Sequence, residues 1–118
     1  MNHEKITAHA LSKPGTRMRY PFDPELPVLF VGDKMFALLG TTSGVPSINL
    51  KADPETVWLT RETYPGTVLP GYHMNKKHWN TVVLNGTLSD DIVLDMLEES
   101  YQLVRRKLTK AVKEELGL

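Results

Sequence analysis

Residues 28–51 have the sequence VLFVGDKMFALLGTTSGVPSINLK, and this stretch decides the fold. Val28–Val31 and Met35–Leu39 are apolar runs on either side of a Gly-Asp pair that favours a tight turn, so together they predict a hairpin. Gly40–Pro46 predicts a second turn. Ser47–Lys51 alternates apolar and polar side chains as a half-buried strand does. Consecutive strands with short connections predict an antiparallel meander, since parallel strands need long crossovers.

The segments around this meander predict helices and further strands. Asp53-Pro54-Glu55 is a strong helix start, because Asp accepts free backbone N–H groups and Pro has no N–H to leave unpaired. After Ser89 a long helix carries acidic residues early and basic residues late, which complements its macrodipole. The short last helix either stands alone or continues the long one. In chain order the predicted elements are a helix over 3–12, strands over 16–22, 28–31, 35–39 and 47–51, a helix over 54–63, a strand over 81–84, a helix over 89–108 and a helix over 109–116.

Length and composition predict one domain spanning residues 1–118. A chain of 118 residues with 41% apolar side chains is long enough to bury a substantial core. The order of elements predicts an α+β fold, with an antiparallel sheet of about five strands and helices packed on one of its faces. The large apolar side chains Phe22, Phe30, Phe36 and Trp58 are expected in the core, with Val57 and Trp58 on the inner side of their helix.

Several classes of chemistry are absent from the sequence. Without cysteine there are no disulfides, thiolate nucleophiles or iron–sulfur clusters. There is neither a phosphate-binding glycine motif nor a nucleophile elbow, and His73 and His78 lie five residues apart without a nearby carboxylate. We therefore expect no enzyme, cofactor or metal. No apolar run approaches ~18 residues, so we expect a cytoplasmic protein without a signal peptide or membrane span.

The run Gly71–Thr81, GYHMNKKHWNT, holds the densest group of binding side chains. Lys76 and Lys77 offer charges for phosphate or carboxylate, and Tyr72 and Trp79 offer flat faces for stacking. Because an apolar strand follows at once, these groups lie where a loop enters a rigid element. The alternative is that the run specifies a corner of the fold. We expect mixed roles, with Trp79 and Thr81 structural and the basic residues functional.

Residues 75–82, NKKHWNTV, make the chain resemble the MmcQ/YjbR family of small bacterial proteins along almost its whole length. Ser47–Lys51, Asp53-Pro54-Glu55, the turn Asn85-Gly86 and the helix with Glu99-Ser100-Tyr101 match as well. The resemblance implies an α/β fold with an antiparallel sheet, described as a double wing and similar to secretion-chaperone-like folds. It also implies a predicted DNA-binding protein without enzymatic activity. The signature positions carried over are Asn75, Lys76, His78, Trp79 and Thr81.

Three hypotheses for function follow. The first is DNA binding through basic residues on hairpins and around the Asn-Lys-Lys-His-Trp motif, which in a chain of zero net charge requires the cations to gather on one flank. The second is an adaptor that binds a peptide or protein partner on its sheet. The third is a small-ligand pocket around Tyr72, His73 and Trp79. The predicted DNA contacts are Arg17, Arg19, Lys34, Lys76, Lys77 and His78.

Overall fold

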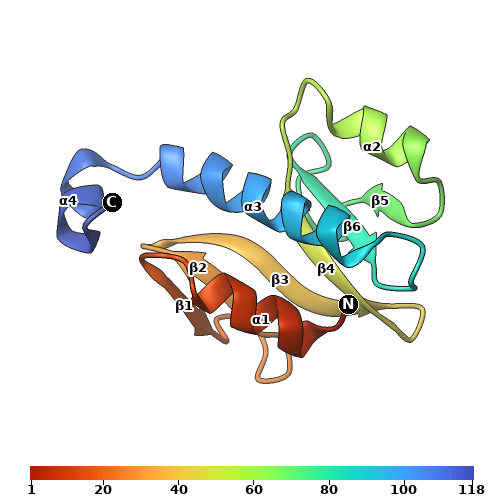
Figure 1. Ribbon diagram of the computed structural model, residues 1–118, viewed down its shortest axis with the longest axis horizontal. Helices are drawn as coiled ribbons and strands as arrows, with labels where there is room; N and C mark the ends of the chain where they lie inside the picture. Colours follow the sequence, from red (N-terminus) through yellow and green to blue (C-terminus); the bar gives the residue numbers. More distant parts are fainter.

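A six-stranded antiparallel sheet, with strand order β1-β2-β3-β4-β6-β5, organises the molecule (Figure 1). The computed structural model describes residues 1–118. The strands are β1 (Thr16–Arg19), β2 (Val28–Val31), β3 (Lys34–Thr42), β4 (Val45–Lys51), β5 (Val68–Pro70) and β6 (Trp79–Val83), and the helices are α1 (His3–Leu11), α2 (Val57–Thr63), α3 (Asp90–Arg106) and α4 (Lys110–Leu116). The predicted α+β class is confirmed, and the meander supplies the first four strands in their predicted order.

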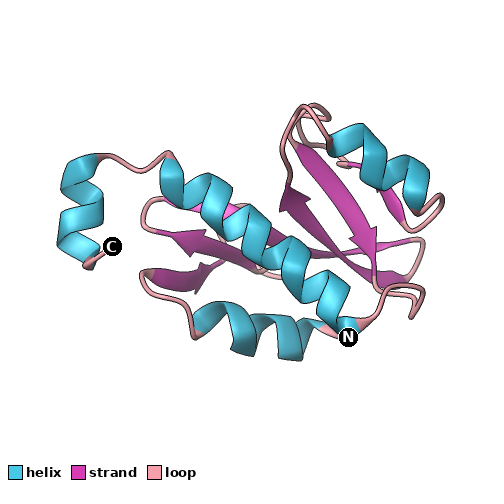
Figure 2. Ribbon diagram, turned by 45° about the horizontal axis from the view of Figure 1, so that its top comes forward, coloured by secondary structure: helices cyan, strands magenta, loops and turns pink.

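Helices α1, α2 and α3 pack on one face of this sheet, as predicted, with α3 crossing it diagonally beside α1, whereas α4 lies beyond the end of the sheet at the β2–β3 turn (Figures 1 and 2). Ile48 and Leu50 of β4 are buried in the core under α3, together with Phe36 and Tyr101. The rings of Phe36 and Tyr101 meet edge to face with centroids 5.5 Å apart. Because side chains alternate along a strand, the other residues of β4 face away from this core. That opposite face carries a smaller apolar cluster.

The β3–β4 hairpin is longer than the sequence predicted. The turn predicted over 40–46 is confined to Ser43 and Gly44, whose φ angles of 50° and 80° are those of a two-residue type I′ turn. This turn matches the twist of the flanking strands, so pairing continues from Ala37↔Leu50 to Thr42↔Val45. Strand β5 was not predicted, because its residues lie in a segment rich in Gly and Pro.

Two of the side chains expected in the core are exposed. Trp58 is 52% exposed, and its helix α2 begins at Val57 and not at residue 54. Consecutive helical residues point about 100° apart, so with Val57 buried the indole of Trp58 lies outside and donates to Glu55 O at 2.9 Å. Phe22 is 65% exposed, because β1 ends at Arg19 and the following proline-rich loop leaves the sheet.

The remaining predicted core aromatics are less exposed. Phe36 is fully buried, and Phe30 packs half-buried against the smaller cluster on the opposite face.

The C-terminal helices begin at side-chain caps that the sequence marks. Ser89 Oγ accepts the Ile92 N–H at 3.3 Å, as predicted for the start of α3. Thr109 Oγ1 accepts the Val112 N–H at 3.2 Å, so α4 is a separate helix and not a continuation of α3. None of the helices has both the length and the apolar character needed to cross a bilayer.

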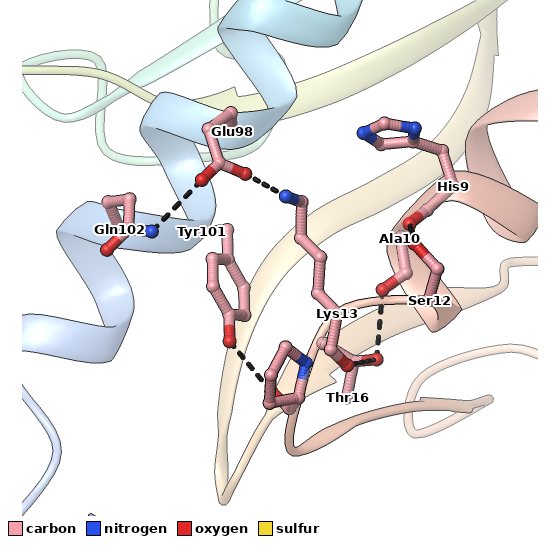
Figure 3. Close-up of polar contacts among 9 residues, drawn as sticks. His9, Ala10, Ser12, Lys13, Thr16, Glu98, Tyr101 and Gln102 are labelled. Carbon is pink, nitrogen blue, oxygen red and sulfur yellow. Dashed lines mark hydrogen bonds and ion pairs between the residues drawn. The ribbon is translucent and has the colours of Figure 1, made fainter. Parts of the chain in front are cut away.

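Helix α3 is fixed to the connection between α1 and β1 (Figure 3). The Tyr101 hydroxyl donates to Pro14 O at 2.7 Å. The Lys13 ammonium pairs with Glu98 and lies 5.3 Å from the centroid of the Tyr101 ring. Gln102 Nε2 donates to Glu98 Oε1 at 3.0 Å. These contacts set the position of α3 along the sheet, and therefore the place where its basic C-terminal end lies.

Candidate nucleic-acid interface

Asn75 builds the turn that presents the motif lysines. Its carbonyl accepts the N–H groups of His78 and Trp79 at 3.1 and 2.9 Å. Its side-chain Oδ1 accepts the Lys77 N–H at 3.0 Å. The turn therefore closes on itself, and Lys76 and Lys77 point into solvent. Asn75 is a structural residue of the motif, and the two lysines are free to bind an anion.

Trp79 and Thr81 hold this corner of the sheet from inside. Trp79 is 7% exposed and packs with Val28 and Leu38 in the smaller apolar cluster. Thr81 Oγ1 accepts the Tyr72 N–H at 3.1 Å and donates to the side chain of Asn49. Both side chains are committed to the fold, as the mixed assignment expects.

Arg61 of α2 ties the motif turn to the helix. Its Nε donates to Asn80 Oδ1 at 2.7 Å, and its Nη2 donates to Trp79 O at 3.1 Å and to Lys76 O. Asn80 is 4% exposed, so the guanidinium supplies hydrogen bonds that water does not readily replace. Sequence reasoning missed this residue, because nothing local to α2 indicates where the Arg61 side chain reaches.

The motif turn lies beside the end of β4. Trp79 pairs with Lys51 across the sheet, and the Ala52 N–H donates to His78 O at 2.8 Å. The backbone N–H of Lys51 is fixed in turn by Ser100 of α3, whose Oγ accepts it at 2.8 Å and donates to Phe36 O at 2.5 Å. Three separate segments thus converge on the position of Lys51.

A cavity of 330 Å³ opens at this convergence. The basic side chains that line it are Lys51, His78, Arg106 and Lys107, and Asp53 is the one carboxylate among them. One oxygen of that carboxylate, Oδ1, already accepts the Glu55 N–H at 2.9 Å. Among the charged side chains that line the cavity, the three cations Lys51, Arg106 and Lys107 outnumber the single carboxylate.

The pKa of Lys51 reflects its partly buried position beside other cations. Burial lowers the pKa of its ammonium below the usual 10.5, and the nearby Lys107 and Lys34 lower that pKa further. No carboxylate forms an ion pair with any of these three lysines, since the ion pairs of the molecule are Met1–Asp90 and Lys13–Glu98. An anion bound here would relieve repulsion among cations that the protein leaves uncompensated.

The same end of the sheet also receives Arg17. Its Nη2 donates to Gly32 O at 3.4 Å, in the turn that precedes Lys34. Arg19 lies two residues further along β1, opposite Val28 and away from that turn. We call the following set the basic end: Arg17, Lys34, Lys51, His78, Arg106 and Lys107. Lys76 and Lys77 flank it on the motif turn. Of the predicted contacts, all but Arg19 thus lie at or beside the basic end.

Helix α3 separates the charges of the neutral chain. Its first turns carry Asp90, Asp91 and Asp95, and its last turn carries Arg105 and Arg106. At a rise of about 1.5 Å per residue, the helix separates these acidic and basic groups by about 15–24 Å. Helix α3 thus carries its acidic side chains at its start and its basic side chains at its end.

Lys51, Arg106 and Lys107 were missed as contacts. The helix-dipole explanation accounted for Arg106 and Lys107, and Lys51 resembled any polar residue at the end of a strand. The pairing of β4 with β6 brings Lys51 to His78, and no local signal in the sequence encodes that pairing.

Fold and site together define a small α+β protein with an antiparallel sheet and a cationic cavity at one end of it. A family model described as YjbR matches residues 11–103, and the chain belongs to the YjbR family. It is 41% identical to the uncharacterised protein YbdF of Escherichia coli O157:H7, over 92% of this chain and 88% of that one.

Two further relatives agree. Identity to the uncharacterised protein YjbR of Escherichia coli strain K12 is 31%, over 86% of each chain. The crystal structure of the Deinococcus radiodurans protein DR2400 superposes with a TM-score of 0.90 at 38% identity, covering 99% of this chain and 88% of that one. The family resemblance seen in the sequence is confirmed.

Proposed function

We propose that the protein binds DNA through its basic end, as a binding protein without catalytic activity. The observation that carries the proposal is a cavity lined by Lys51, Arg106 and Lys107, none of which has an ion-pair partner. Proteins normally pair or disperse such charges. Phosphates along a nucleic-acid backbone would supply the missing counter-charges.

The dimensions of the basic end suit a backbone contact. Arg17 on β1 and His78 before β6 are separated by four strand spacings, or about 19 Å. One strand of a duplex advances 3.4 Å per nucleotide along its axis, so this width matches about six nucleotides. Lysine ammonium groups act as point charges on phosphates, which fixes position and carries little base specificity.

The adaptor hypothesis has less support from the sheet edges. A peptide that adds a strand needs an open edge of reasonable length. Edge strand β1 has four residues, including Arg17 and Arg19, and edge strand β5 has three residues and ends in Pro70. Short, charged or proline-containing edges resist strand addition.

Fluorescence anisotropy of a short labelled duplex at two salt concentrations tests the proposal. With about four phosphate contacts the logarithm of affinity falls with a slope of about −3.6 against the logarithm of salt concentration, or about 100-fold between about 50 and 200 mM. We expect Lys51→Gln with Lys107→Gln to reduce the magnitude of this slope by about 2.

The matched control removes the same charge elsewhere. Lys5→Gln with Arg19→Gln deletes two exposed cations outside the basic end. This control should keep the wild-type slope, because the side chains do not reach the phosphates. If both double variants lose affinity and salt dependence equally, net charge alone drives binding. If the wild-type protein does not bind the duplex at low salt, the proposal is wrong.

A further inference from the structure

A larger cavity, distinct from the basic end, lies over the face of the sheet that the helices leave open. Its volume is 720 Å³, within the range of small-molecule sites. The loop with Phe22 and Leu26 forms one wall, and the loop with Tyr72 and Met74 forms the other. No residue of the basic end lines it.

Gly40 of β3 lies at the base of this cavity and, having no side chain, does not fill it. A Cβ at this position would have Leu26 Cδ1 as its nearest neighbour, at 3.7 Å. The absence of a side chain therefore leaves a space between the sheet and the wall, and a larger side chain would occupy it. This geometry gives a direct way to close the cavity by substitution.

The floor presents an oriented hydrogen-bond donor. Asn49 Oδ1 accepts from the Thr81 hydroxyl, and Thr81 Oγ1 is itself held by the Tyr72 N–H at 3.1 Å. The amide oxygen of Asn49 is thus occupied, while its Nδ2 has no protein partner. Since Asn49 lines the cavity, this amine is available to an acceptor on a ligand.

The charged side chains that line the cavity are all acidic. Asp23 and Glu25 line it together with two histidines, His3 and His73, which count as neutral in the formal charge, and no lysine or arginine lines it. Neither carboxylate belongs to an ion pair, since those of the molecule involve Asp90 and Glu98. An uncompensated pair of carboxylates beside an apolar hollow favours a positively charged ligand.

Two aromatic rings stand open at the rim. Phe22 is 65% and Tyr72 is 69% exposed, although both are large and line the cavity. The adjacent His73 has a backbone φ of 58°, which is uncommon outside glycine. The centroid of its imidazole ring lies 4.0 Å from the centroid of the Tyr72 ring. Exposed aromatic faces bind flat rings and cations.

From these features we infer that the open-face cavity binds a small organic cation that carries an aromatic ring and a hydrogen-bond acceptor. The ammonium group lies against Asp23 and Glu25, the ring stacks on Tyr72 or Phe22, and the acceptor receives the free N–H of Asn49. This inference stands apart from DNA binding, because no residue of the basic end lines this cavity and the charges that line it have the opposite sign.

Three probes of matched shape separate the contributions. Tyramine has the ring, the acceptor and the cation; 4-ethylphenol lacks the charge; 4-hydroxyphenylacetate replaces it with an anion. In an NMR titration we expect tyramine to shift the amides of Gly40, Asn49 and Thr81 and to bind about tenfold more tightly than 4-ethylphenol, with the anion weakest.

Substitutions then assign the binding to this cavity. Asp23→Asn with Glu25→Gln should abolish the preference for tyramine over 4-ethylphenol. Gly40→Leu should block both ligands, with circular dichroism confirming that the variant is folded. The matched control Glu114→Gln with Glu115→Gln removes two carboxylates of α4 and should leave the affinity unchanged.

Several results would overturn the inference. One is the absence of shifts at the cavity residues at about 5 mM tyramine, well above the affinity range of specific small ligands. Another is that 4-hydroxyphenylacetate, or the neutral blocked peptide acetyl-trialanine amide, binds as tightly as tyramine. Equal loss of tyramine binding in the α4 control would show a non-specific charge effect.

Discussion

Replacing Arg61 with methionine tests how the motif turn is held. Methionine keeps an apolar stem but removes every donor of the guanidinium. Asn80 Oδ1, on a side chain that is 4% exposed, loses its 2.7 Å hydrogen bond and remains unpaired. Trp79 O keeps one partner, because it also accepts the Gly71 N–H at 2.9 Å. The main cost is therefore one unsatisfied buried acceptor, with smaller losses at two carbonyls.

An unpaired buried polar group costs about 1–3 kcal/mol, so we expect Arg61→Met to lower the free energy of unfolding by about 2–3 kcal/mol. For a domain of this size the corresponding fall in Tm is about 8–12 °C. Thermal unfolding followed by circular dichroism measures it. The Tm of Arg61→Lys should lie between those of the wild type and Arg61→Met, because one ammonium group cannot donate to all the acceptors that the guanidinium satisfies.

Arg19→Met is the matched control, since Arg19 is exposed and donates no hydrogen bond in the structure. Its Tm should equal that of the wild type. If Arg61→Met also unfolds within about 2 °C of the wild type, the acceptors find other partners, because the unpaired-acceptor cost alone exceeds that shift. The assignment of Arg61 as the residue that holds the turn would then be wrong.

Three other substitutions test further parts of the structure. Ser100→Ala removes the hydroxyl that accepts the Lys51 N–H inside the core, and urea unfolding should show a loss of about 1–3 kcal/mol. Gly71→Ala places a Cβ 2.8 Å from the Trp79 Cβ and 2.9 Å from the Trp79 carbonyl oxygen, so we expect a loss of about 1–3 kcal/mol by the same method; unchanged stability would mean that the backbone moves freely there. Hydrogen bonds from its neighbours hold the pKa of Glu98 below the usual 4.5, so its contribution is complete above that pH and disappears as pH falls through the lower folded value. Glu98→Gln should therefore cost less than about 1 kcal/mol near neutral pH, since the carboxylate is 42% exposed, and nothing in strong acid; a pH-independent difference would contradict this.

Local chemistry made much of the fold predictable. Ser89 and Thr109 cap helices through atoms only three residues away, so their positions can be inferred from the sequence alone. The prediction for Trp58 was wrong, because adjacent residues of a helix point about 100° apart and the burial of Val57 turns the indole outward. Two neighbouring residues of a short helix such as Val57 and Trp58 therefore rarely both face the core.

The candidate site was less predictable than the fold. Lys76, Lys77 and His78 lie in one short turn, and their shared location could be inferred from the sequence. Lys51 and Lys107 join them only because β4 pairs with β6 and because the side chain of Ser100 fixes α3 to the end of β4. These contacts connect residues far apart in the chain, which hydrophobic periodicity and capping signals do not report.

An NMR titration of the uniformly labelled protein with a short DNA duplex at low salt locates the DNA contact without any substitution. If the basic end binds DNA, the backbone amides of Lys34, Ala52, His78 and Lys107 should shift first and together, and raising the salt concentration should reverse these shifts. Shifts centred instead on the acidic start of α3 or on the open-face cavity, or none anywhere at saturating duplex, would contradict the proposed DNA contact.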